Sequence, residues 1–299
     1  MKTVVFLLRI ILPLSFAVSL ADWLGILAKI GTLLAPAMGI FHLPGEAAVV
    51  LVSGWLVGIY GAVAAMAILH LSAAQVTVLA LMTLTAHNLP VETTVQHRTG
   101  TPWWLNLIAR VGTSAVLGWI AAFALHAAGG DSALQGAAAT AAEAPAHAGF
   151  VAFLAQWAVS AGKLAAKVLV ILLALMLLTE WMRARDVYHR IAQPLRPLLA
   201  FMGLSASVAF LWITAMVLGL AYGSGLLMEE AREPGRYRAG DLRDLNISIG
   251  VCHSVLEDTA LLASLGASLF WITLPRLIAA ALVVRAVRLC APRIGDPAR

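Results

Sequence analysis

The residues TAHNLPVETT at 85–94 interrupt an apolar segment that is otherwise suited to a membrane. They place a histidine, an asparagine, a proline and a glutamate inside the apolar region. A second interruption, 250–259, reads GVCHSVLEDT and carries a histidine and two adjacent carboxylates. Backbone at membrane depth can leave the helix only where protein or a water-filled cavity satisfies its polar groups. The two stretches therefore predict discontinuous helices or re-entrant hairpins.

The composition of the chain supports a membrane setting for both interruptions. Of its 299 residues, 61% are hydrophobic and only 12% are Asp, Glu, Lys or Arg, and the mean hydropathy is +0.90. Soluble domains carry about 25% charged residues, so a water-soluble globule and a separate soluble catalytic domain are excluded. We expect an all-α polytopic membrane protein. Its apolar stretches are residues 3–30, 47–69, 73–89, 103–126, 150–181, 204–228, 241–268 and 269–289.

The second half of the sequence repeats features of the first half at a nearly constant offset. The pair Tyr60-Gly61 matches Tyr222-Gly223, and Glu92 matches Glu257. Further matches join Met66 to Met228, Thr94 to Thr259, Gly100 to Gly266 and Trp104 to Trp271. These matches predict a first membrane repeat at 1–126, an Ala/Gly-rich non-cytoplasmic joint at 127–149 and a second membrane repeat at 150–299.

The distribution of basic residues predicts that the two repeats are inverted. The joint contains no Lys or Arg, which places it outside the cytoplasm by the positive-inside rule. Basic residues after the fifth stretch and at the end of the chain belong in the cytoplasm: Arg183, Arg185, Arg190, Arg196, Arg285, Arg288, Arg293 and Arg299. We expect a multi-pass bacterial-type inner membrane protein with both termini in the cytoplasm. Each repeat then contains one discontinuous or re-entrant helix.

Two further features bear on the setting of the chain. The first apolar stretch resembles a secretory signal, but Arg9 interrupts it, so we expect it to be a membrane helix. The formal charge of +5 is spread over the ends of segments and never forms a dense basic run, so it indicates membrane topology. The expected partners are therefore the lipid bilayer and a small solute or metal ion, and not a nucleic acid.

Ionisable residues are concentrated in the two interruptions. A carboxylate at the bilayer centre costs about 2.5 to 3.5 kcal/mol, so such groups need protonation, a counter-charge, water or a bound cation. Imidazole nitrogens with carboxylate oxygens suit Fe(II), Mn(II) or Zn(II). The predicted metal ligands are His87, Glu92, His253, Glu257 and Asp258, and Asn88 and Ser254 complete the predicted substrate-binding set. Cys252 could add a soft ligand.

A purely structural interpretation of the same residues stays open. Ser254 and Glu257 have the spacing of a capping box, in which the serine caps a restarting helix and the glutamate reaches back to its backbone. Asn88 with Pro90 has the pattern of a helix start. Arg110 and Arg276 lie in the helices that follow the interruptions and could pair with the carboxylates or with an anionic substrate.

The motif Ala86-His87-Asn88-Leu89-Pro90 resembles the first gate segment of the ferrous-iron transporter B family, where a Cys-Asn-x-Pro stretch breaks a membrane helix. The wider pattern resembles the nucleoside-recognition or Gate domain superfamily, which includes spore-maturation-type proteins. The resemblance implies a transport-type core whose paired gates hold a site. Here His87 replaces the family's cysteine, Asn88 and Pro90 match the motif, and the second break carries Cys252-His253 without a proline.

The sequence thus predicts a permease core for a divalent metal ion. The metal is the substrate, and no cofactor is expected. The alternatives are a carrier for a nucleoside or small organic anion, and a non-transporting assembly or maturation factor acting with a second copy or another membrane protein. An enzyme is not expected, since the chain has no HExxH, GxSxG or GxxxxGK[ST] motif. Cys252 and Cys290 form no CxxC pair, which argues against a disulfide framework.

Overall fold

A computed structural model describes residues 2–127, 149–185, 187, 190, 194–231, 233 and 235–290. In the first half the helices are α1 (Lys2–Trp23), α2 (Ile26–Gly39), η1 (Gly45–Ala47), α3 (Ala48–Val57), α4 (Ile59–Met66), α5 (Ala73–Thr85), α6 (Leu89–Arg98) and α7 (Trp103–Leu125). In the second half they are α9 (Phe150–Ala184), α11 (Arg196–Phe201), η3 (Ala206–Val208), α12 (Ala209–Glu230), α13 (Ala239–Val251), α14 (Glu257–Ala263) and α15 (Leu269–Cys290). The described residues contain no β-strand, which confirms the predicted all-α polytopic membrane fold.

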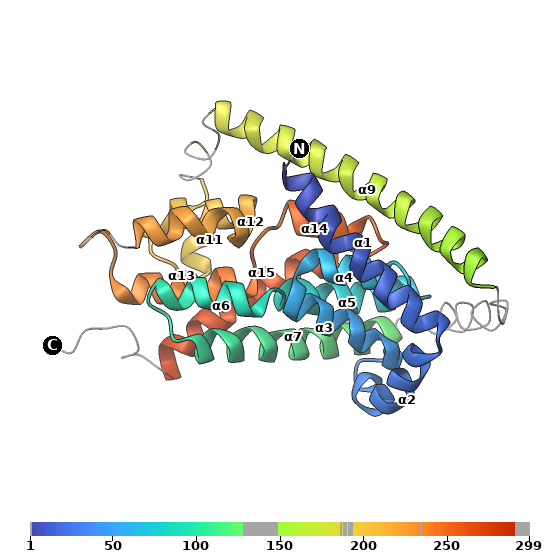
Figure 1. Ribbon diagram of the computed structural model, residues 1–299. Coiled ribbons are helices and arrows are strands. Elements are labelled where there is room, and N and C mark those ends of the chain that lie inside the picture. The colour runs from blue at the N-terminus through green and yellow to red at the C-terminus, as the bar shows by residue number, and fades with distance from the viewer. Residues whose placement is uncertain are drawn as a thin grey trace.

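Three helices of the described part are long and apolar enough to cross a membrane by themselves. They are α7, α9 and α15. The α1–α2 pair adds a fourth crossing if its two arms count as one span, but they meet at an angle of 87°. The prediction of one continuous stretch over 3–30 is therefore wrong, since Gly25 takes a left-handed backbone (φ 69°) and ends the first arm. Figure 1 shows α9 running along the outer edge of the molecule.

Both predicted interruptions are helix breaks in the structure. Between α5 and α6, Asn88 adopts a left-handed backbone with φ of 47°, and Pro90 is the second residue of the new helix. Proline lacks an amide hydrogen and disfavours helical backbone in the preceding residue, so α5 cannot continue through it. Between α13 and α14, Ser254 adopts nearly the same conformation (φ 49°) without a proline.

Two further breaks occur at glycines that the sequence interpretation had not identified as breaks. Gly58 (φ 103°) separates α3 from α4, and Gly219 (φ 74°) interrupts α12. Such positive φ values favour glycine because it has no Cβ. Each glycine break meets one of the predicted breaks, since an added Cβ would lie 3.5 Å from Asn88 Cβ at Gly58 and 3.2 Å from Ser254 Cβ at Gly219.

The facing breaks satisfy part of each other's freed backbone. The amide of Asn88 donates to the carbonyl of Gly54 at 2.8 Å, and the amide of Ser254 donates to the carbonyl of Ala215 at 3.1 Å. Val255 N also donates to Met216 O at 2.8 Å. Irregular backbone at membrane depth is tolerated when it is buried in protein and hydrogen-bonded in this way.

The structure fixes the offset between the two halves at 166 residues around the predicted breaks. Helices α5 and α13 each have 13 residues, and the positive-φ positions Asn88 and Gly100 correspond to Ser254 and Gly266. At this offset Glu92 corresponds to Asp258, so the sequence match of Glu92 with Glu257 is shifted by one residue. The inverted orientation of the halves stays a prediction. The joint at 127–149 lies outside the described residues except for its two end residues.

Helices α5 and α13 form the centre of the fold. Every residue of α5 from Val76 to Thr85 is buried, and so is every residue of α13 from Leu242 to Val251. Helix α5 contacts α7 and α15, and α13 contacts the same two helices. Figure 1 shows these elements grouped beneath α9. The two predicted breaks therefore end central, fully packed helices, and His87 and His253 lie buried at these helix ends.

Candidate functional site

The two breaks bring His87 and His253 together in the buried centre of the protein. The ring centroids lie 4.9 Å apart, and the two residues are 4% and 1% exposed. In each histidine, Nδ1 lies close to the carbonyl of the residue four positions earlier, Thr83 O at 3.1 Å and Ile249 O at 2.6 Å. A carbonyl can only accept a hydrogen bond, so each Nδ1 carries a proton, and in the neutral ring this tautomer leaves the Nε2 lone pair free to bind a cation.

Two carboxylates face these Nε2 atoms. Glu92 Oε1 lies 3.4 Å from His87 Nε2 and 3.5 Å from His253 Nε2. Asp258 Oδ2 lies 3.4 Å from His87 Nε2. In the described part of the chain, His87, Glu92 and His253 are a group whose ligand atoms all lie within 4.8 Å of one another. We name these three residues and Asp258 the central cluster.

Two buried arginines hold the backbone around the central cluster. Arg110 donates to the carbonyls of His87 (2.7 Å) and Thr85 (3.3 Å). Arg276 donates to the carbonyls of His253 (2.9 Å) and Leu84 (3.2 Å). Both are fully buried. A guanidinium near the end of a helix offsets the partial negative charge of its free carbonyls, so the arginines stabilise the two breaks.

Arg110 also orients one member of the cluster. Its Nη1 lies 2.8 Å from Glu92 Oε2, which leaves Oε1 for the two imidazoles. The sequence expectation that Arg110 could pair with a carboxylate is thus met. Arg276 differs from its repeat counterpart, because among the described residues it forms no ion pair and is held by carbonyl oxygens alone.

Glu257 and Cys252 do not join the central cluster. Tyr60 donates a hydrogen bond to Glu257 Oε1, so this carboxylate faces α4. The capping box predicted for Ser254 and Glu257 is wrong, because α14 begins at Glu257, its N-cap is Leu256, and no side chain caps it. Cys252 is fully buried at the end of α13, and its sulfur is outside the group of facing ligand atoms.

The remaining predicted residues lie at the breaks themselves. Asn88 and Ser254 occupy the left-handed positions, and Pro90 is exposed at the start of α6. Asn88 is the N-cap of α6, as predicted, although its side chain forms no capping bond. Sequence reasoning missed Tyr60 as the partner of Glu257. The only signal was the Tyr-Gly pair repeated near the middle of a helix in each half.

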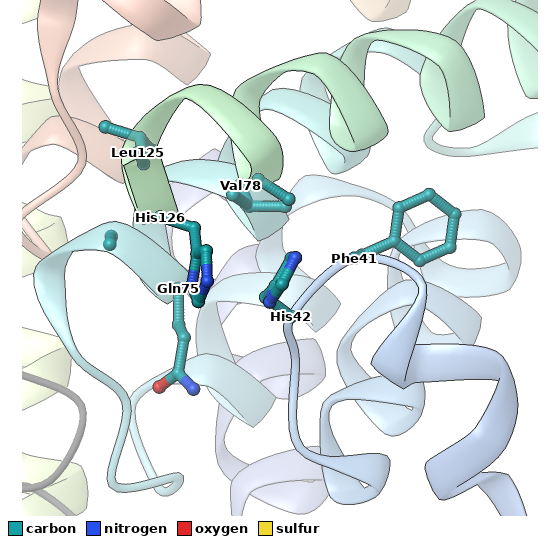
Figure 2. Close-up of a pocket in the computed structure, with 8 residues that line it drawn as sticks. Phe41, His42, Gln75, Val78, Leu125 and His126 are labelled. Carbon is teal, nitrogen blue, oxygen red and sulfur yellow. The ribbon is translucent and has the colours of Figure 1, made fainter. Parts of the chain in front are cut away.

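A second pair of imidazoles lies at the surface. His42, after α2, and His126, at the end of α7, stack with ring centroids 4.2 Å apart. Figure 2 shows them side by side at a small pocket, with Gln75 of α5 below. Both histidines are exposed. No carboxylate lines this pocket, which separates it chemically from the central cluster.

Two comparisons with known proteins find similar sequences. Residues 4–97 match the sequence model of the family described as Gate, nucleoside recognition, a region that contains the first break with His87 and Glu92. The chain is similar to YvoD, an uncharacterized membrane protein of Bacillus subtilis (strain 168), with 29% identity over 279 residues, 93% of this chain and 88% of that protein. No solved structure matches the chain. The chain is thus a polytopic membrane protein whose expected resemblance to the Gate nucleoside-recognition family is confirmed over residues 4–97.

Proposed function

We propose that this protein is a transport core that binds a divalent transition-metal ion as its substrate. His87, His253 and Glu92 supply three ligand atoms. Asp258 lies outside that group, but its Oδ2 contacts His87 Nε2 at 3.4 Å, and it is the proposed fourth ligand. Two imidazoles with two carboxylates are a donor set suited to Zn(II), Mn(II) or Fe(II). Glu257 and Cys252, both considered from the sequence, are left out of this set because their side chains lie elsewhere.

The spacing of the ligand atoms carries the proposal. A tetrahedral ion bound at about 2.0 to 2.1 Å holds its ligand atoms about 3.3 to 3.4 Å apart. The three contacts of the cluster measure 3.4, 3.4 and 3.5 Å. Hydrogen bonds from nitrogen to oxygen are shorter, about 2.7 to 3.2 Å. These three contacts therefore match the spacing between ligand atoms in a coordination shell.

The orientation of the histidines supports the same function. Both Nδ1 atoms are held by backbone carbonyls, so lone pairs on Nε2 face carboxylate oxygens that are also electron-rich. The Nε2 lone pairs and the facing oxygen of Glu92 repel each other, and a cation bound between these three atoms would remove the repulsion. Bonds from Nδ1 to a carbonyl, and from Arg110 to Glu92, are the outer interactions that orient metal ligands in proteins.

The arginines give less support to an anionic substrate. Arg110 is bonded to two carbonyls and to Glu92, and Arg276 is bonded to three carbonyls. Their charges are therefore offset by backbone and by a carboxylate of the protein. An incoming carboxylate or phosphate would have to displace these bonds and approach two acidic side chains.

Transport is proposed because the metal ligands lie at the facing breaks of two helices. Corresponding breaks in two halves of a chain are typical of binding sites in secondary transporters. The basic residues of the second half support an inner-membrane location with the C-terminal end of α15 in the cytoplasm, as Arg285 and Arg288 lie in its last turns.

Metal titration of the purified protein tests the proposal. Zn(II), Mn(II), Fe(II) and Co(II) are titrated into the detergent-solubilised chain and into the His87→Ala/His253→Ala variant. We expect saturable binding of one ion per chain, which the double substitution abolishes. Glu257→Gln is the matched control, because it changes a carboxylate next to Asp258 that lies outside the cluster. Binding that is absent from the wild type, or unchanged in the folded double variant, would refute the proposal.

A further inference from the structure

The hairpin of α6 and α7 carries a column of polar side chains that begins at the central cluster. The ion pair of Glu92 and Arg110 joins the two antiparallel helices at the depth of the cluster. One helical turn closer to the tip, α6 presents Gln96 and α7 presents Asn106, four residues along each helix. The column thus continues from charged groups to amides.

The column ends in a hydrogen-bonded group at the tip of the hairpin. Asn246 of α13 donates to Thr99 Oγ1 at 2.9 Å and to Thr101 Oγ1 at 3.0 Å. Gln96 Nε2 donates to the backbone carbonyl of Asn246 at 2.8 Å. Helix α13 therefore forms the other wall of the column and fixes the direction of the Gln96 amide.

Several polar atoms in the middle of the column have no partner among the described residues. They are Gln96 Oε1 and both amide atoms of Asn106. Both side chains are fully buried. Buried amides almost always have hydrogen-bond partners, so an asparagine with neither atom bonded needs water or an ion. The unpartnered oxygens are neutral donors of the type that hard, partly hydrated cations accept.

The second repeat shows that the fold does not need polar residues at these positions. At the offset of 166 residues, Gln96 corresponds to Leu262 and Asn106 to Ile272, both fully buried. The two threonines at the tip, Thr99 and Thr101, also correspond to the apolar residues Leu265 and Ala267. The equivalent hairpin of α14 and α15 is therefore packed with apolar side chains where α6 and α7 carry the column.

Gly250 of α13 leaves room for the side chains of the column, and the first repeat has no glycine at the corresponding position. A Cβ added to Gly250 would lie 3.0 Å from Gln96 Nε2 and 3.5 Å from Arg110 Cδ. The residue at the corresponding position in the first repeat is Leu84. Gly250 thus lets the polar side chains between the cluster and the tip approach the α13 backbone.

We propose that the polar column is a hydrated route for cations between the central cluster and the Gly100 tip, with Gln96 Oε1 and Asn106 Oδ1 as a second binding station. The apolar hairpin of α14 and α15 seals the opposite direction. The assignment of a metal ion as the ion that moves along this route rests on the proposed function. The hydration of the column is inferred only from the buried amide atoms of Gln96 and Asn106 that have no hydrogen-bond partner.

Cysteine accessibility tests the hydration of the column without reference to metal. Gln96→Cys and Leu262→Cys are made separately in a Cys290→Ser background, where the remaining Cys252 is fully buried. A small, positively charged thiol reagent should modify Gln96→Cys on the order of tenfold faster than Leu262→Cys. Equal rates, or faster reaction at the Leu262→Cys site, would overturn the proposal.

The variant Asn106→Ile tests the station, since it installs the residue of the second repeat. We expect it to unfold at the wild-type temperature or higher and to bind metal at the central cluster with unchanged affinity. Metal flux into proteoliposomes should be abolished. Unchanged flux would overturn the station, and so would loss of binding in the folded variant. If the wild type binds no metal, the proposed function fails, and the cysteine experiment still decides on the hydrated column.

Discussion

Replacing Glu92 by glutamine separates the charge of this residue from its shape. Glu92 Oε1 faces both imidazoles at 3.4 and 3.5 Å, and Oε2 lies 2.8 Å from Arg110 Nη1. Glutamine keeps the side-chain volume but removes the negative charge from both interactions. The substitution should therefore weaken metal binding and also leave the buried Arg110 without its counter-ion.

The expected size of each effect follows from these contacts. Removing one partner of a buried ion pair costs about 3 to 5 kcal/mol. Because two backbone carbonyls still accept hydrogen bonds from Arg110, the free energy of unfolding should fall by about 3 kcal/mol, the lower end of this range. Removing a residue that only orients a metal ligand lowers the affinity for the metal by about 10- to 100-fold. Because Glu92 is proposed to bind the metal directly, its replacement should lower the affinity by at least about 100-fold. Asp258→Asn should have a smaller effect, because within the central cluster Asp258 contacts His87 alone.

Calorimetric titration with Zn(II) and thermal unfolding in detergent measure the two effects separately. Glu257→Gln is the control, as it makes the same chemical change one residue from the cluster. A Glu92→Gln variant that binds metal within about twofold of the wild-type affinity would refute the assignment of Glu92 as a ligand. An unchanged unfolding temperature would refute the stabilising role of its pair with Arg110.

The remaining predictions concern the breaks and the neighbouring carboxylate. Gly58→Ala and Gly219→Ala should each lower the unfolding free energy by about 1 to 3 kcal/mol, because alanine is strained at positive φ, whereas Gly162→Ala in the open face of α9 should be neutral or stabilising in the same thermal assay. Tyr60→Phe should destabilise the protein by about 1 to 3 kcal/mol, because the carboxylate of Glu257 loses its donor. Metal affinity measured by titration should stay unchanged in Tyr60→Phe, and a large loss would place Glu257 in the site after all.

The positions of the two predicted breaks could be read from the sequence because several signals coincide there. Pro90 excludes a continuous helix, and ionisable residues inside an apolar segment need a partner. The same reasoning singled out His87 and His253, which the fold brings together. Composition and segment length were sufficient to predict the all-α membrane fold.

The glycine breaks could not be predicted by the same reasoning. A glycine in an apolar helix is more often a site of close packing than of a break, so Gly58 carried no signal of its own. Its break becomes evident only when the amide of Asn88 is seen bonding to Gly54 O in the neighbouring helix. That contact joins segments far apart in the chain, so no local pattern contains it.

The choice between two adjacent carboxylates also needed the structure. Successive residues on a helix point about 100° apart, so Glu257 and Asp258 cannot face the same partner. The register is set by the left-handed residue Ser254, which directs Asp258 toward His87 and Glu257 toward Tyr60. The sequence prediction therefore included both carboxylates as ligands, whereas in the structure only Asp258 contacts His87.

X-ray absorption spectroscopy of the zinc-loaded protein tests the central claim most directly. The central cluster predicts a four-coordinate shell of nitrogen and oxygen at about 2.0 to 2.1 Å, with the outer scattering of two imidazoles. That outer scattering should disappear in the His87→Ala/His253→Ala variant. A sulfur ligand at about 2.3 Å, a spectrum without imidazole, or a spectrum unchanged by the double substitution would contradict the metal site.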